Sequence, residues 1–298
     1  MELNSILFPS PKFNFETALQ YDGELIFIPK PKEKNSYIPC LFLINAVKKI
    51  SEKFLIFFHG NAEDIFGALD ICEKLKDSLQ MNIIIVEYPT YSIYNYESDT
   101  NKILENSLIV FDFLINELGA LKENIFIFGR SIGTSPAIYL SSKRKPGALI
   151  AVSGFTSIKD AARSLVGNIL QVLVKERFTS IEYIKNVTCP ILFIHGQKDQ
   201  LIPFEHSLKL KNNCKCPYEI FLPENMTHNE FNYEKDLLGP IDEFLSKHTG
   251  IKTDLDSHIK IPNGLFEMPS FIRNNIKKNC EVSSNSFVSC FGNNINNE

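Results

Sequence analysis

The sequence predicts an α/β fold, with a doubly wound, mostly parallel sheet that opens on an antiparallel pair of strands. Continuous apolar runs of strand length recur along the chain. Such runs are typical of strands that are buried on both faces of a parallel sheet. Helical patterns lie between the runs, and right-handed crossovers would place these helices on both faces of the sheet.

The elements follow one another in a regular order. Residues 24–29 and 37–44 are apolar and β-favouring, with Pro, Lys, Glu and Asn between them, so we expect an antiparallel opening pair. Core strands are expected at residues 53–60, 82–88, 124–129, 148–154, 190–196 and 218–223. Helices are expected at residues 64–79, 99–118, 133–142, 157–174, 204–211 and 230–247.

Residues 1–249 are expected to form one domain, because α/β units of this size are ordinary. Within it, residues 156–187 are expected to form a small helical lid. An apolar stripe in the lid fits core packing and a lipid-facing surface equally well: Leu165, Ile169, Val172 and Leu173. Residues 250–298 are rich in Asn and Ser, so we expect a largely irregular C-terminal tail with one short helix at 270–278.

The composition excludes several classes of protein. With 44% hydrophobic and 22% charged residues, the chain of 298 residues fits a globular protein with a large core. Its net charge of −4 argues against a nucleic-acid partner, which needs clustered Lys and Arg. No secretory leader, spanning segment or lipidation signal is recognisable, so we expect a cytoplasmic protein. Peripheral contact with a membrane stays open, although no anchor encodes it.

Seven cysteines are scattered along the chain without a CxxC pair, and we expect reduced thiols. Cys214 and Cys216 would suit the start of a metal site, but a second ligand pair at zinc spacing is missing. We therefore expect neither a metal nor a cofactor.

Ser131 stands between two glycines in the stretch GRSIG, with a predicted strand before it and a predicted helix after it. This G-x-S-x-G pattern in that context indicates a nucleophile elbow, although a chance Gly-Ser-Gly loop would share the bare pattern. Gly129 and Gly133 leave space in a turn so tight that a Cβ at either position would clash. The helix N-terminus beside the serine favours developing negative charge.

A serine hydroxyl needs a histidine as base and a carboxylate that orients it, in the chain order Ser, Asp, His. Among six histidines, only His228 lies in a loop after a late strand with a helix following. Asp199 lies in the loop that directly follows the strand at 190–196, at the same sheet edge as Ser131. The rival carboxylates lie in the final helix or very near His228 in the chain: Asp236, Asp242 and Glu224.

Cleavage of an acyl bond also needs N–H donors for the negative charge on the carbonyl oxygen. In this arrangement one donor is the residue after the serine, which is Ile132, and the other comes from the loop after the third strand. That loop reads FFHGNAEDI, where Gly60 lets the backbone come close and Asn61 offers its N–H. We expect His59 to be a structural hinge of this loop rather than a second base.

From about residue 37 to 245 the chain resembles the α/β-hydrolase superfamily, within the group that includes the ABHD17 depalmitoylases and the Bem46-like serine hydrolases. The motifs that carry the resemblance are HGNAEDI, FGRSIGTSPAIYLSSK, TSIEYIKNVTCPILFIHGQKDQLIPFEHS and MTHNEF. It implies the α/β-hydrolase fold, with Ser131 as nucleophile, Asp199 as orienting acid and His228 as base. It also implies Asn61 and Ile132 as oxyanion donors.

The expected activity is hydrolysis of an acyl ester or thioester, of the depalmitoylase type, through an acyl-enzyme. The substrate would be an acylated small molecule or a lipidated protein. Two alternatives stay open: a peptidase of the same superfamily, which commonly bears a larger cap, and an inactive binding protein that keeps the fold.

The chain departs from the group at two places. Where the group usually has Tyr-Pro-Gly-Tyr-Gly after the fourth strand, this chain has YPTYS at residues 88–92, which puts substrate choice in doubt. The mammalian depalmitoylases also begin with a lipidated cysteine cluster, whereas the first cysteine here is Cys40, inside the predicted sheet. Membrane attachment is therefore not implied.

Overall fold

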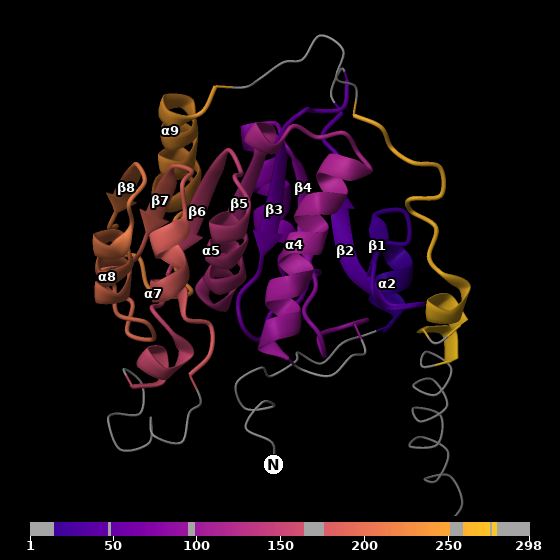
Figure 1. The fold of residues 1–298 in the computed structure, drawn as a ribbon, viewed down its shortest axis with the longest axis horizontal. Helices are drawn as coiled ribbons and strands as arrows, with labels where there is room; N and C mark the ends of the chain where they lie inside the picture. Colours follow the sequence, from indigo (N-terminus) through magenta and orange to yellow (C-terminus); the bar gives the residue numbers. More distant parts are fainter. Residues whose placement is uncertain are drawn as a thin grey trace, which may run out of the picture.

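A computed structural model describes residues 15–46, 49–94, 99–163, 176–250, 259–274 and 276–278. An eight-stranded sheet in the order β1-β2-β4-β3-β5-β6-β7-β8 crosses the whole domain (Figure 1). The opening strands β1 (Leu25–Pro29) and β2 (Tyr37–Leu43) pair antiparallel, and β2 also runs antiparallel to β4. The remaining strands are parallel, so the predicted mostly parallel sheet with an antiparallel start is confirmed.

Six strands make up the parallel part: β3 (Phe54–Phe58), β4 (Asn82–Val86), β5 (Ile125–Arg130), β6 (Ala148–Val152), β7 (Ile191–Ile194) and β8 (Tyr218–Phe221). The strands β3, β4, β6 and β7 are buried along their whole length. The expectation of a core strand at residues 218–223 needs correction, because β8 is half-buried or exposed at every position. It is the last strand of the sheet, so one of its backbone edges has no neighbour among the described strands.

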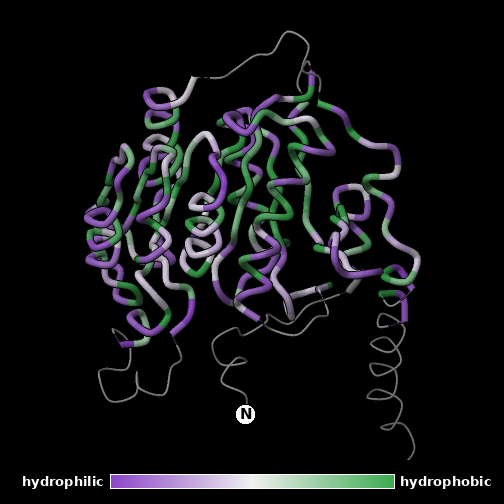
Figure 2. Tube along the Cα trace, in the orientation of Figure 1, coloured by the Kyte–Doolittle hydropathy of each residue, from purple (hydrophilic) through white to green (hydrophobic). Residues whose placement is uncertain are grey.

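Helices cover both faces of the sheet, as a doubly wound fold requires (Figure 1). One face packs against α4 (Thr100–Asn116), α5 (Thr134–Lys143), α7 (Ser180–Tyr183) and α8 (Glu205–Asn213). The other face packs against α2 (Phe15–Gln20), α3 (Leu69–Leu79), the π-helix η5 (Tyr233–Leu238) and α9 (Gly239–His248). Short 3-10 turns complete the chain: η1 (Lys122–Asn124), η2 (Ser131–Gly133) and η4 (Ile184–Asn186). Figure 2 shows the hydrophobic residues concentrated along the central strands.

Some helix boundaries differ from the predicted ones for local chemical reasons. The helix α3 begins at Leu69 rather than at residue 64, because the Asp64 carboxylate accepts the N–H groups of Phe66 and Gly67 at 3.1 and 2.8 Å and holds a turn there. The last helix opens with the π-helical turn η5 before α9. In the predicted lid, residues 158–163 are helical. Residues 164–175, with the apolar stripe Leu165, Ile169, Val172 and Leu173, lie outside the described residues.

Part of the expected C-terminal tail lies against the domain. Residues 259–269 contain neither helix nor strand, yet Ile259, Ile261 and Leu265 pack on the core. The Phe266 ring stacks on Phe42 with centroids 6.0 Å apart. A short helix follows at 270–274, within the predicted range. These apolar residues lie within eight positions of a tail that is rich in Asn and Ser, so the composition of the whole tail underestimates how much of this segment packs on the core.

Among the helices that the structure describes, none combines the length and the apolar character needed to cross a membrane.

Candidate active site

Ser131 lies on a sharp turn between β5 and α5. Its backbone adopts φ +54°, in the left-handed region that non-glycine residues seldom occupy. The strand before it ends at Arg130 and the turn η2 begins at the serine itself. Ser131 is only 7% exposed. This is the geometry expected of a nucleophile elbow.

Both glycines of the elbow are required by close backbone contacts. A Cβ added to Gly129 would lie 2.4 Å from the carbonyl oxygen of Gly133, which is the crowding expected from the sequence. A Cβ added to Gly133 would lie 2.1 Å from the carbonyl oxygen of Phe58, at the end of β3. The elbow therefore packs tightly against β3, the strand that leads into the loop with Asn61.

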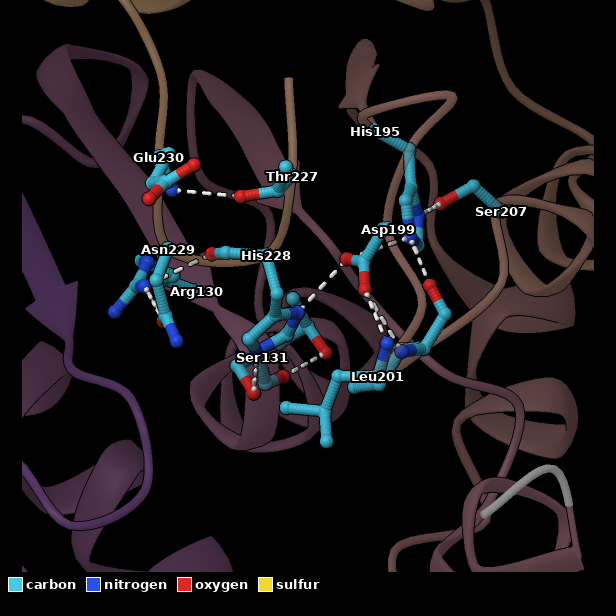
Figure 3. A network of polar contacts seen from close by, with 12 residues as sticks. Arg130, Ser131, His195, Asp199, Leu201, Ser207, Thr227, His228, Asn229 and Glu230 are labelled. Atoms are coloured by element: carbon cyan, nitrogen blue, oxygen red, sulfur yellow. Dashed lines mark hydrogen bonds and ion pairs between the residues drawn. The ribbon is translucent and has the colours of Figure 1, made fainter. Parts of the chain in front are cut away.

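Ser131, His228 and Asp199 form one chain of hydrogen bonds (Figure 3). The distance from Ser131 Oγ to His228 Nε2 is 3.0 Å, and that from His228 Nδ1 to Asp199 Oδ2 is 2.8 Å. Since a carboxylate only accepts, Nδ1 carries the proton and donates it, which leaves Nε2 to accept the serine O–H. The imidazole is thus oriented to remove a proton from the serine.

Asp199 is held as a carboxylate by several donors. Its Oδ1 accepts the backbone N–H groups of Leu201 and Ile202 at 3.0 and 2.8 Å. Burial by itself would raise the pKa of Asp199, but hydrogen bonds from His195, His228 and the Ile202 N–H lower it further than burial raises it. The net shift is downward, so the group stays ionised beside the imidazole.

His195 is a second, fully buried histidine against Asp199, with its Nε2 3.3 Å from Asp199 Oδ2. The same nitrogen lies 2.8 Å from the Ile202 carbonyl oxygen, and the Nδ1 lies 2.7 Å from the Ser207 hydroxyl on α8. His195 is not among the site residues that the sequence predicts. The overlooked signal is its position four residues before Asp199, across a tight turn.

Arg130 is the functional residue that sequence reasoning missed most clearly, although it is the second residue of the GRSIG motif. Its guanidinium donates to the His228 carbonyl at 3.0 Å and to Asn229 Oδ1 at 2.9 Å (Figure 3). It also lies 3.4 Å from the Glu63 carboxylate, which accepts the Gly60 N–H at 2.8 Å. Arg130 therefore connects the serine turn with the histidine loop and the loop after β3.

The two expected oxyanion donors lie on the segments predicted for them. Ile132 directly follows the serine in η2, and Asn61 lies in the loop after β3. Asn61 is exposed, and its side-chain oxygen accepts the Tyr91 hydroxyl at 2.7 Å. Tyr91 comes from the loop after β4, so two neighbouring loops meet at Asn61.

Beneath this loop, His59 and Glu87 form a fully buried pair with His59 Nε2 3.1 Å from Glu87 Oε1. Burial would lower the pKa of His59, but the hydrogen bond and charge of Glu87 raise it above the ordinary value. The Tyr88 hydroxyl donates to the His59 carbonyl at 2.8 Å. These contacts fit the expected structural role of His59 in the loop.

The loop after β4 keeps glycine-like backbone angles without glycine. Thr90 has φ +77° and Ser92 has φ +38°, at the positions where the resembling group has glycines. The Ser92 hydroxyl hydrogen-bonds to the Glu87 carboxylate, and the Thr90 N–H donates to the Tyr94 carbonyl at 2.9 Å. These bonds hold a conformation that is strained for both side chains.

Comparisons with known proteins find similarity to serine hydrolases and to α/β-hydrolase domain-containing proteins. A family model described as serine hydrolase (FSH1) matches residues 126–229, the segment that contains all three residues of the hydrogen-bonded chain. The α/β-hydrolase domain-containing protein 17C of Xenopus laevis is 28% identical over 72% of this chain and 67% of its own length. The human α/β-hydrolase domain-containing protein 17B is 27% identical over 72% of this chain and 73% of its own.

Solved structures show the same fold. An esterase of Pyrococcus furiosus superposes with a TM-score of 0.63 at 15% identity, over 81% of this chain and all of its own. The mouse α/β-hydrolase domain-containing protein 10 superposes with a TM-score of 0.57 at 16% identity, over 75% of this chain and 98% of its own. The chain therefore has the α/β-hydrolase fold, part of it matches a serine hydrolase family model, and it is similar to the α/β-hydrolase domain-containing proteins 17B and 17C.

Proposed function

We propose that the protein is a serine esterase or thioesterase that removes an acyl group through a covalent acyl-enzyme. The observation that carries the proposal is the continuous path of hydrogen bonds from Ser131 through His228 to Asp199, on a strained turn between a strand and a helix. A serine on a tight turn, a base within 3.0 Å and an ionised orienting group are what nucleophilic acyl transfer needs.

The reaction proceeds in two steps. His228 accepts the Ser131 proton as the serine attacks the acyl carbonyl, and Asp199 stabilises the imidazolium that forms. The N–H groups of Ile132 and Asn61 stabilise the oxyanion, where each such donor contributes on the order of 10²–10³ in rate. The imidazolium then protonates the leaving group, and a water activated by His228 releases the acid and regenerates the serine.

The proposed substrate carries an apolar acyl chain, as in a depalmitoylase, on a small molecule or a lipidated protein in the cytoplasm. Leu201, whose N–H is bonded to Asp199, is 41% exposed and so offers an apolar side chain next to the triad. Large exposed apolar side chains are few among the described residues, which makes its position beside the carboxylate informative.

The mechanism is tested by labelling with a fluorophosphonate probe, which reacts with activated serines. The wild type should be labelled, and Ser131→Ala should abolish the label. Ser142→Ala is the matched control, because Ser142 lies on α5 beyond the elbow, where its hydroxyl donates to the Tyr139 carbonyl. Label that survives Ser131→Ala would contradict the proposed nucleophile, whereas a wild type that does not react would favour a binding protein.

A substrate panel then separates the classes of acyl bond. p-Nitrophenyl esters of increasing chain length, palmitoyl thioesters and aminoacyl amides would be compared by kcat/KM. We expect turnover of esters or thioesters with a preference for longer chains. Preferred cleavage of the amides would instead identify a peptidase.

A further inference from the structure

The loop that joins α8 to β8, at the outer end of the sheet, carries two thiols in close contact (Figure 1). Cys214 directly follows the last residue of α8, and Cys216 lies two positions before the start of β8; their sulfurs are 3.2 Å apart. Neither residue takes part in the proposed acyl transfer. The pair therefore needs its own explanation.

These two cysteines differ from the other cysteines that the structure describes. Cys40, Cys72 and Cys189 are buried, whereas Cys214 and Cys216 are partly exposed. Solvent and small reagents can therefore reach this pair. Both residues also lie outside regular secondary structure, where the backbone can adjust to a change in side-chain bonding.

The pair is chemically polarised. The hydrogen bond with the Cys216 thiol lowers the pKa of Cys214 to about 7, while the same contact and burial raise the pKa of Cys216. By contrast, burial raises the pKa of the neighbouring Cys189 to about 12. The short sulfur–sulfur contact therefore favours a thiolate on one cysteine beside a protonated thiol on the other, and thiolates are the reactive form.

We propose that Cys214 and Cys216 form a reversible intramolecular disulfide with a low-molecular-weight disulfide such as glutathione disulfide as oxidant. In a disulfide the sulfurs are about 2.05 Å apart, so the observed contact has to shorten by only about 1 Å. A disulfide closed over so few residues is expected to be strained and easily reduced, as labile regulatory disulfides are.

The disulfide forms in two successive thiol–disulfide exchange steps. The Cys214 thiolate attacks one sulfur of glutathione disulfide, forming a mixed disulfide and releasing one glutathione thiolate. Cys216 then loses its proton and attacks the Cys214 sulfur, which expels the second glutathione thiolate. The protein is oxidised by the loss of two hydrogen atoms, and one glutathione disulfide is reduced to two glutathione molecules.

The chain offers a direct test, because trypsin cleaves after Lys211, Lys215 and Lys235 and so separates the two cysteines. The full-length reduced protein is incubated with glutathione disulfide, blocked with N-ethylmaleimide and digested. We expect peptides 212–215 and 216–235 to remain joined and to separate after treatment with dithiothreitol. Two separately blocked peptides, or a joined pair that includes peptide 186–198 with Cys189, would overturn the proposal.

Two variants distinguish the pair from general thiol reactivity. Cys216→Ala should leave glutathione attached to Cys214, because no resolving thiol remains. Its Cys214 should also react with limiting N-ethylmaleimide at pH 7 about fivefold more slowly than wild type, since fewer molecules carry the thiolate. Cys189→Ala is the matched control and should leave the joined peptides unchanged. An unchanged labelling rate in Cys216→Ala would contradict the inferred polarisation.

Discussion

Removing the Arg130 side chain should slow catalysis by displacing His228 without touching the reacting atoms. Arg130→Met keeps most of the apolar stem but deletes the charged hydrogen bonds to the His228 carbonyl and to Asn229, at 3.0 and 2.9 Å. It also leaves the Glu63 carboxylate, 3.4 Å away, without this cation. The side chain is 15% exposed, so these contacts are only partly screened by water.

The expected magnitude follows from these contacts. A hydrogen bond from a charged group contributes about 1.5–3 kcal/mol. When Arg130 loses such bonds, part of this free energy should be lost as a displacement of the His228 imidazole. A displacement of the base by about 1 Å can lower the rate about 100-fold, so we expect kcat to fall between about 10-fold and 100-fold. That corresponds to about 1.4–2.7 kcal/mol of transition-state stabilisation. KM should change little, because the guanidinium bonds protein groups and not the acyl chain.

The assay compares kcat, KM and the rate of fluorophosphonate labelling with those of a matched variant. Arg144→Met removes a guanidinium, directly after the end of α5, that makes two bonds to Asp112 on α4 at 2.8 and 2.7 Å. It should leave kcat unchanged, because this pair does not contact the proposed triad. If Arg130→Met keeps kcat within about twofold of wild type, or if both variants lose kcat equally, the positioning role is refuted.

Three further outcomes are expected. Thr90→Gly should raise the free energy of unfolding by about 1 kcal/mol. The strain of a threonine in the left-handed region, about 1–3 kcal/mol, is larger than the entropy cost of glycine. A lower melting temperature would contradict the strain. The pKa of His59 is raised in the folded state. The contribution of this shift to stability is therefore complete below about pH 6.5 and is lost as the pH rises through the pKa of the folded state. The difference in unfolding free energy between wild type and His59→Gln, measured by urea unfolding, should therefore shrink as the pH rises. A difference that stays constant with pH would show that His59 does not titrate in this way. Gly133→Ala places a Cβ 2.1 Å from the Phe58 carbonyl oxygen. It should lower the free energy of unfolding by about 3 kcal/mol and abolish fluorophosphonate labelling. An unchanged urea midpoint would be incompatible with the tight elbow.

The strands could be predicted from the sequence because a strand buried on both faces needs apolar residues at every position. The run at 54–58, for example, is buried throughout in the structure. The same rule fails for β8, since an apolar run does not reveal that a strand lies at the edge of the sheet. The start of α3 was also missed, because the Asp64 turn is a local competition between a side chain and the helix.

The members of the proposed triad could be chosen because the chemistry limits the residue types and the topology limits their places. Ser131, Asp199 and His228 each follow a strand at the same edge, and the structure brings them within hydrogen-bonding distance. Arg130 and His195 could not be chosen in this way. Their roles depend on which distant carbonyl or carboxylate lies within reach, and neither residue type is demanded by the reaction itself.

Backbone strain collects at this same edge of the sheet. Of the eight non-glycine residues with positive φ in the described part of the chain, five lie in the loops that follow β3, β4, β5 and β6: Ala62, Thr90, Ser92, Ser131 and Ser153. Each such residue costs of order 1–3 kcal/mol and persists only where the surroundings enforce it. Connections that served only to join strands to helices could relax to ordinary angles with a gain in stability. The concentration of strain around Ser131 therefore favours loops shaped for chemistry over the inactive binding protein that the fold alone would also allow.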